Sequence, residues 1–164
     1  MNKENWRDLT ISYKEACQKS LKNIHDYRKG TKKFIKTGFD ILDNVFFKGL
    51  ETNKLMIIAA LSSVGKTTYT LQLRKNILKN NENVKWLSFN FEMIASDIID
   101  SVITSDLNIT LRELYSVDEQ IEDKTLERIE KLFEIDQEVS FIDVPINYKK
   151  IGSVIYNYWV DECK

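Results

Sequence analysis

The sequence contains few of the residues on which several classes of protein depend. Its 164 residues include two cysteines, Cys17 and Cys163, and one histidine, His25. Two distant cysteines without a Cys-x-x-Cys spacing argue against a disulfide scaffold or a zinc site, and they fit a reducing cytosol. A single histidine argues against a histidine metal cluster and against Ser/His/Asp catalysis.

Long apolar runs and a strong net charge are also absent. No stretch approaches the ~18 apolar residues of a membrane span, and the polar start Met1–Asn5 is unlike a signal peptide. We therefore expect a cytoplasmic protein without membrane contact. The formal net charge is −1, so no overall basic field favours an isolated DNA-binding module. An enzyme that meets DNA through a few loops remains open.

The pattern of apolar residues is typical of one α/β domain. Helical spacing predicts an amphipathic helix over Leu9–Tyr27, and Gly30 follows it as a breaker. Alternating helices and strands then predict a parallel sheet with right-handed crossovers. We expect strands at Leu55–Ala60, Val84–Phe91 and Val139–Asp143, and helices at Ile41–Val45, up to about Asn80, at Ala95–Leu107, at Asp118–Ile135 and from about Tyr148.

One segment, Ala60–Thr67, fits the P-loop pattern G-x-x-x-x-G-K-[ST] between a strand and a helix. Such a turn points backbone N–H groups at phosphate oxygens, next to the N-terminus of a helix. Gly65 lets the backbone approach closely, Lys66 would reach the β- and γ-phosphates, and Thr67 would place its hydroxyl on Mg²⁺. The predicted ligands are therefore ATP and Mg²⁺, and the predicted nucleotide-binding residues are Ala60, Leu61, Ser62, Ser63, Val64, Gly65, Lys66, Thr67 and Thr68.

Ala60 departs from the P-loop pattern, which has glycine at this position. Alanine costs little where φ is negative, as it usually is at the end of a strand. The alternative is a chance Gly-Lys-Thr in an ordinary strand–helix turn. The strand, the loop length and the helix together favour the P-loop over that alternative.

Two carboxylates follow strands at the same predicted edge of the sheet, where parallel sheets bind ligands. Glu92 follows the second strand and could orient and deprotonate an attacking water. The alternative for Glu92 is a helix N-terminal glutamate favoured by the helix dipole. Asp143 ends the third strand and could touch Mg²⁺ indirectly, although a turn residue before Pro145 is the simpler interpretation.

Several of these segments resemble DnaB-type replicative helicases, whose P-loop commonly has alanine at the first glycine position. The resemblance implies a RecA-like P-loop core, with a parallel sheet flanked by helices, and ATP hydrolysis coupled to DNA unwinding in a hexamer. Lys66 and Thr67 would then be the phosphate and Mg²⁺ ligands, and Glu92 the catalytic base. The segments that carry the resemblance are Thr37–Asp43, Gly49–Leu50, Ala59–Thr67, Leu87–Met93 and Phe141–Pro145.

The same resemblance divides the chain into a linker helix and loop, residues 1–36, and a partial ATPase domain, residues 37–164. The linker helix would dock on a neighbouring helicase subunit. Ser101 stands where the family often has arginine, and the Walker B strand, the later strands and the arginine finger are missing from the sequence. The Walker B strand would lie between the P-loop strand and the Glu92 strand, so we expect an incomplete sheet with exposed apolar edges.

Three functions remain open at this point. The chain could be the ATP-binding portion of a DnaB-like helicase, truncated and inactive alone. It could instead be a free-standing protein that docks on a helicase ring and regulates it. The third alternative is another RecA-like ATPase, of the recombination or signalling type.

Overall fold

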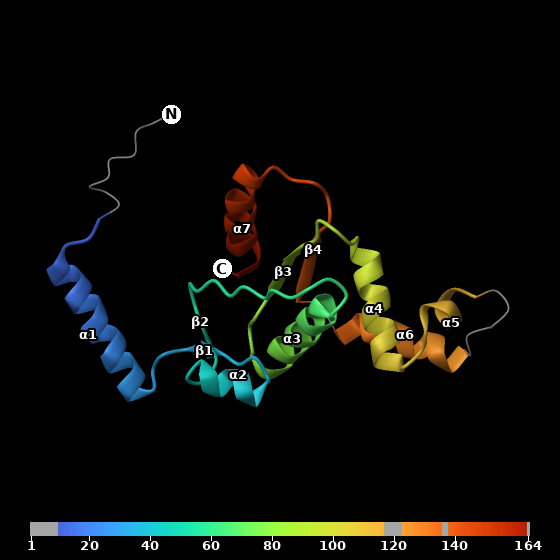
Figure 1. Cartoon of the computed structure of the whole chain (residues 1–164), viewed down its shortest axis with the longest axis horizontal. Coiled ribbons are helices and arrows are strands. Elements are labelled where there is room, and N and C mark those ends of the chain that lie inside the picture. The colour runs from blue at the N-terminus through green and yellow to red at the C-terminus, as the bar shows by residue number, and fades with distance from the viewer. Residues whose placement is uncertain (1–9, 117–122, 136–137, 164) are drawn as a thin grey trace.

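The computed structural model describes residues 10–116, 123–135 and 138–163, and Figure 1 shows its arrangement. Helices and short strands alternate along the chain, so the α/β class predicted from the sequence is confirmed. No helix in the described ranges is long and apolar enough to cross a membrane. The elements are α1 (Tyr13–Lys29), β1 (Phe34–Ile35), α2 (Asp40–Val45), β2 (Leu50–Glu51), α3 (Lys66–Asn80), β3 (Trp86–Phe89), α4 (Ala95–Leu107), α5 (Leu111–Tyr115), α6 (Asp123–Ile135), β4 (Val139–Ile142) and α7 (Tyr148–Cys163).

The described strands form two separate two-stranded sheets. β1 and β2 are antiparallel, with Phe34 opposite Glu51. This strand pair, which has α2 between its two strands, was not predicted. β3 and β4 are parallel and in register from Trp86 opposite Val139 to Phe89 opposite Ile142. Helices α4, α5 and α6 lie in the connection between them, as parallel strands require a long crossover. The parallel pair confirms the part of the predicted sheet that involves the second and third strands.

The predicted strand at Leu55–Ala60 is wrong, because this segment forms no strand in the structure. Its apolar side chains face solvent: Leu55 is 87% exposed and Ile57 is 78% exposed. A strand is stable only when its backbone N–H and C=O groups have a neighbouring strand to pair with. No other described strand runs beside this segment, so its apolar sequence alone does not make it a strand.

The sheet of β3 and β4 also ends in an open edge. The N–H groups of Trp86 and Asn90 donate to carbonyls on the β4 side, both at 2.8 Å. Because backbone groups alternate in direction along a strand, those of Leu87 and Phe89 face the opposite edge. No described strand pairs with that edge. Within the described residues, the parallel sheet therefore has two strands, and its residues are half-buried.

The core gathers around α3, which lies between the sheet and the α4–α6 helices (Figure 1). The Arg74 side chain, 3% exposed, lies over the ring of Phe141 from β4, with 5.7 Å from the guanidinium carbon to the ring centroid. The buried apolar side chains of the described residues come from α3, α4 and α6, and they are Leu73, Ile77, Ile98, Ile103 and Ile129.

A tight turn before α2 packs against α3 and fixes its position. Thr37 is fully buried, and its N–H and hydroxyl both donate to Asp43 Oδ1 at 2.9 Å. Gly38 has a φ of +73°, and a Cβ at this position would lie 2.7 Å from Cβ of Asn76 in α3. Only glycine therefore allows this close approach. The contact holds the helix whose first residue is Lys66.

Most helices form where the sequence predicts them, because local signals define their ends. Helix α1 begins with a capping box between Ser12 and Glu15, and it ends at Gly30, which has a left-handed backbone. The predicted starts at Leu9 and Asp118 lie outside the described residues. The short helix α5 was not predicted.

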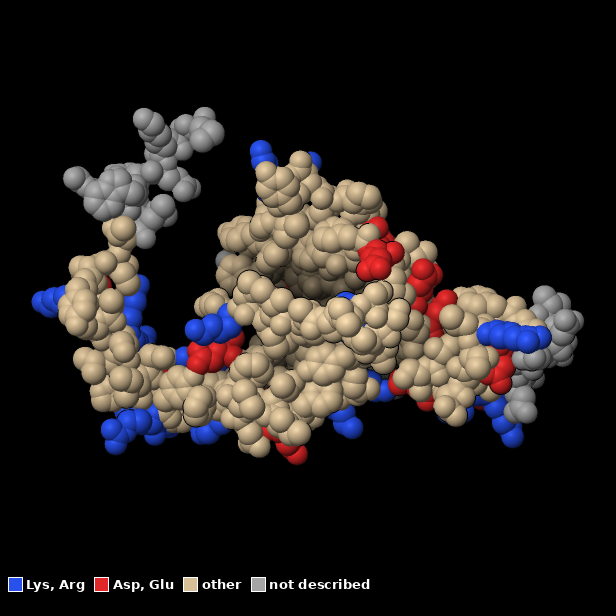
Figure 2. All heavy atoms as spheres, viewed as in Figure 1, with Lys and Arg blue, Asp and Glu red and all other residues tan. Residues whose placement is uncertain are grey.

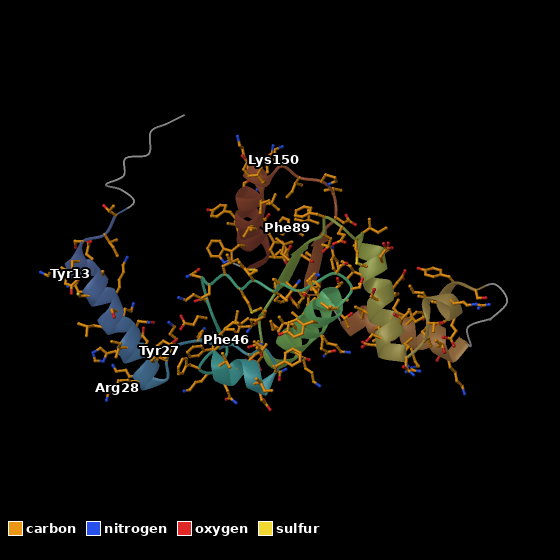
Figure 3. The ribbon with its side chains drawn as sticks, viewed as in Figure 1. Tyr13, Tyr27, Arg28, Phe46, Phe89 and Lys150 are labelled. Atoms are coloured by element: carbon orange, nitrogen blue, oxygen red, sulfur yellow. The ribbon has the colours of Figure 1, made fainter. Side chains whose placement is uncertain are left out.

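Helix α1 extends away from the rest of the molecule and contacts it only near its C-terminal end (Figures 1 and 3). There the Tyr27 hydroxyl donates to Oε1 of Glu51 in β2. The Tyr27 ring also meets Phe34 edge-on, with centroids 5.4 Å apart. Tyr13 lies at the opposite, outer end of the helix (Figure 3).

Candidate nucleotide site

The P-loop segment Ala60–Thr67 is a compact turn that leads directly into α3. Ser63 and Gly65 both have left-handed backbones, with φ values of 61° and 93°. Left-handed residues within a turn curl consecutive N–H groups toward one side, which is how a backbone cradles an anion. Gly65 is also the N-cap of α3, so the unpaired N–H groups of the first helical turn follow the loop at once.

Lys66 folds over the loop that precedes it. Its Nζ donates to the carbonyl oxygens of Ala60 at 3.0 Å and Leu61 at 2.9 Å. Both contacts are solvent-exposed, and the lysine stem is flexible, so the ammonium can exchange these carbonyls for a phosphate on the same side of the loop. Thr67 is exposed, and its hydroxyl makes no hydrogen bond to another described residue. Thr68 is also exposed, but it lines a different cavity, between α3, α4 and α6, from the one that Lys66 and Thr67 line.

A cavity of about 250 Å³ lies between the N-terminal half of α3 and the sheet of β3 and β4. Its lining reaches Phe89 and Asn90 at the carboxyl end of β3, and parallel sheets characteristically hold ligands at that end of their strands. The lining residues are Lys66, Thr67, Thr70, Leu71, Arg74, Trp86, Ser88, Phe89, Asn90, Ile98 and Phe141.

The structure therefore brings Lys66 and Thr67 to one cavity with the end of β3. Glu92 lies two positions beyond Asn90, in the bend before α4, and it is exposed. Glu92 is not among the residues that line the cavity. Its role as the catalytic base stays a prediction.

Asp143 has a structural contact. Its Oδ2 accepts a hydrogen bond at 3.1 Å from the backbone N–H of Ala95, the first residue of α4. The N-cap residue of α4, Ile94, has no side-chain acceptor of its own. Asp143 thus caps α4 from a distant part of the chain, and this contact gives its carboxylate a structural role.

The donor set around the P-loop fits Mg²⁺ only in part. Thr67 supplies one hydroxyl oxygen, and Mg²⁺ in nucleotide sites takes its other oxygens from phosphates, water and one or two carboxylates. Within the described ranges, no three His, Cys, Asp or Glu side chains gather where they could hold a metal ion. Thr67 therefore fits one position beside a nucleotide-bound Mg²⁺, and the described residues offer no preformed cluster of metal ligands.

A larger cavity of about 540 Å³ lies between α3, α4 and α6. Its wall includes the apolar side chains of Leu71, Leu78 and Val102, with the Lys75–Asp106 ion pair at 2.6 Å. It lacks Lys66, Thr67 and the sheet residues. Size alone would favour this cavity, but the smaller one holds the groups that suit a phosphate.

Several residues of the smaller cavity were not singled out by the sequence, among them two polar residues at the end of β3. Ser88 lies on β3 and Asn90 directly follows that strand, and the Ser88 hydroxyl donates to Asn90 Oδ1 at 2.7 Å. A polar residue at the carboxyl end of a predicted strand, close to Glu92, is the signal that could have identified Asn90.

Taken together, the parallel strand pair of β3 and β4, with α3 packed beside it and connecting helices between the two strands, defines an α/β protein. Residues 34–152 match the family model of the DnaB-like helicase C terminal domain. The chain belongs to this family, as the sequence predicted.

The relatives in this family are replicative helicases. The replicative DNA helicase DnaC of Bacillus subtilis (strain 168) and the replicative DNA helicase DnaB of Geobacillus stearothermophilus are each 34% identical over 96 residues, covering 58% of this chain and 20% of each relative. A probable replicative DNA helicase of Guillardia theta is 31% identical over 106 residues, covering 63% of this chain and 17% of the relative. The chain thus spans about a fifth of the length of these relatives.

Proposed function

We propose that this chain is the ATP-binding portion of a DnaB-like replicative helicase, with a RecA-like core that is incomplete within these residues. The observation that carries this proposal is the P-loop turn at the start of α3, beside a cavity at the carboxyl end of β3. Its relatives are named as replicative DNA helicases, and the family match favours this function over that of a recombination or signalling ATPase.

In the proposed complex, the ATP phosphates lie against the turn of Ala60–Thr67 and the first N–H groups of α3. Lys66 leaves the carbonyls of Ala60 and Leu61 and contacts the β- and γ-phosphates. Thr67 places its hydroxyl on Mg²⁺, which would neutralise charge on the same phosphates. Thr68 supports the α-phosphate side.

Hydrolysis and unwinding are proposed for the complete protein. Glu92 follows β3 and would orient the attacking water and accept its proton. Because Glu92 is exposed and outside the cavity lining, the bend that carries it must move toward the phosphates. ATP hydrolysis coupled to DNA unwinding in a hexamer would also need groups that residues 1–164 do not provide.

The nucleotide site is tested by calorimetric titration of the chain with Mg²⁺-ATP. We expect Lys66→Ala to weaken ATP binding at least about tenfold, because a hydrogen bond to a charged group is lost. Lys150→Ala is the matched control. Lys150 is exposed in the first turn of α7 (Figure 3), and its replacement should leave the affinity for ATP unchanged. Equal affinities for Lys66→Ala and the parent chain would remove the P-loop proposal.

Helix α1 supports a second candidate, a protein that docks on a helicase ring. No described α1 residue is buried, and Tyr13, Leu21 and Ile24 are 87%, 57% and 49% exposed. An amphipathic helix with an uncovered apolar stripe is suited to pack on another protein. Figure 2 shows basic side chains along the same helix.

Docking is tested by pull-down of a purified DnaB-like helicase with the chain. We expect the double substitution Leu21→Ser with Ile24→Ser to abolish association, because the apolar stripe would be lost. Lys19→Ser, at an exposed position on the same helix, is the control and should still associate. Unchanged association of the double variant would count against docking through α1.

A further inference from the structure

Asn90 is a polar residue of the nucleotide cavity to which the proposed function assigns no role. Its backbone N–H donates to the carbonyl of Ile142 at 2.8 Å, which fixes its place beside β4. Its side chain belongs to the lining of the cavity that also includes Lys66 and Thr67. The side-chain Nδ2 is buried and has no hydrogen-bond partner within the described part of the chain.

Ser88 occupies one end of the Asn90 amide. The Ser88 hydroxyl donates to Asn90 Oδ1 at 2.7 Å, so the acceptor end of the amide is satisfied and the donor end is not. Buried amide donors without an acceptor are rare in folded proteins, because each one lowers stability. An unsatisfied buried donor in a binding cavity therefore indicates an acceptor supplied by a ligand.

The surroundings of this donor suit an anionic acceptor. Lys66 contributes an ammonium to the same cavity, and Thr67 contributes a hydroxyl. The N-terminus of α3, which begins at Lys66, adds the positive end of a helix dipole. A phosphate oxygen accepts hydrogen bonds from such donors and is favoured by the local charge.

We propose that Asn90 is a further nucleotide-binding residue, and that its Nδ2 donates to an oxygen of the terminal phosphate of ATP. This inference rests on the proposed function. Lys66 would hold the terminal phosphates from the α3 side of the cavity, and Asn90 would hold them from the β3 side. ADP has no third phosphate, so this contact distinguishes ATP from ADP.

The proposal is tested by calorimetric titration of the chain with Mg²⁺-ATP and with Mg²⁺-ADP. Asn90→Ala is expected to weaken ATP binding about tenfold, the loss typical of one hydrogen bond to a charged group, and to leave ADP binding nearly unchanged. Asn90→Asp keeps the acceptor for Ser88 and replaces Nδ2 by a carboxylate oxygen, so ATP binding should fall further. Asn157→Ala, at an exposed position of α7, is the control and should alter neither affinity.

The outcomes separate this role from a structural one and from the proposed function. Thermal unfolding of each variant shows whether it folds. If Asn90→Ala does not fold, Asn90→Asp tests the role of Asn90 instead, because aspartate has nearly the shape of asparagine. An unchanged ratio of ATP to ADP affinity in the folded variants overturns the role of Asn90. If Lys66→Ala still weakens both nucleotides, the proposed function stands. A parent chain that binds neither nucleotide overturns both.

Discussion

The segments Leu55–Ala60 and Trp86–Phe89 are both short and rich in apolar residues, yet only the second is a strand. β3 pairs with β4 over four residues of each strand, and α3 covers one face through Arg74 over Phe141. Leu55–Ala60 has no such neighbour among the described residues, and its side chains are largely exposed. An apolar sequence makes a strand possible, and a partner makes it form.

This comparison is tested most directly by one truncation in Leu55–Ala60 and one in α3, the helix that packs against the paired strands. Leu73→Ala removes a side chain that is 2% exposed and should lower the free energy of unfolding by about 2–5 kcal/mol. Ile57→Ala, at a position 78% exposed, should change it by less than about 0.5 kcal/mol. Urea denaturation measures both changes. A large loss in Ile57→Ala would show that the segment is packed in solution.

A smaller effect is expected where the paired region is held by a cap. Asp143→Ala removes the acceptor for the Ala95 N–H at the start of α4 and should lower the free energy of unfolding by about 1 kcal/mol. Asp97→Ala, at an exposed position in the first turn of α4, is the control for general loss of negative charge there. Equal losses in the two variants, measured by urea denaturation, would mean that the cap has no specific role.

The smallest effect concerns pH and the start of β3. The Glu138 carboxylate, and then Glu162, hydrogen-bond Lys85 and raise the pKa of its ammonium. The pKa of Lys85 is higher in the folded chain than in the unfolded chain, where a lysine has a pKa of about 10.4. The stability that the Lys85 ion pairs contribute is therefore complete below that pH, and it is lost as the pH rises through the folded pKa. The unfolding temperature of the parent chain should therefore fall above that pH.

Lys85→Met is the variant that checks this explanation. Its unfolding temperature should respond less to alkaline pH than that of the parent chain, because the titrating ammonium is gone. The effect is small, since the Lys85 side chain is 29% exposed, both carboxylate partners are 53% exposed, and solvent-accessible ion pairs contribute little. Identical pH profiles for both chains would show that Lys85 does not link α7 and the two strands.

The elements that sequence predicted well are those with local signals. Helix α1 carries its own caps at Ser12 and Gly30, and α3 follows a P-loop turn and ends at Asn80 as expected. The pair of β1 and β2 was missed, because strands of two residues each leave no periodic pattern. The strand at Leu55–Ala60 was overpredicted, because apolar composition predicts burial without identifying a partner.

The candidate site divides in the same way. The P-loop residues follow from one contiguous motif, whose turn and helix depend on neighbours in the sequence. Asn90 and Arg74 were not predicted, because they become part of the cavity only when β3 packs against α3. Asp143 could not be assigned a capping role from sequence, since the N–H that it accepts from is 48 positions away.

By itself, the sequence determined most of the helices, the phosphate-loop motif and the family, because each depends on residues close together in the chain. The tertiary structure alone decided which apolar segment pairs as a strand, where Asp143 binds and which polar groups share a cavity with Lys66. Those features depend on contacts between distant segments, and a backbone or side-chain group far from its partner in sequence gives no local sign of it.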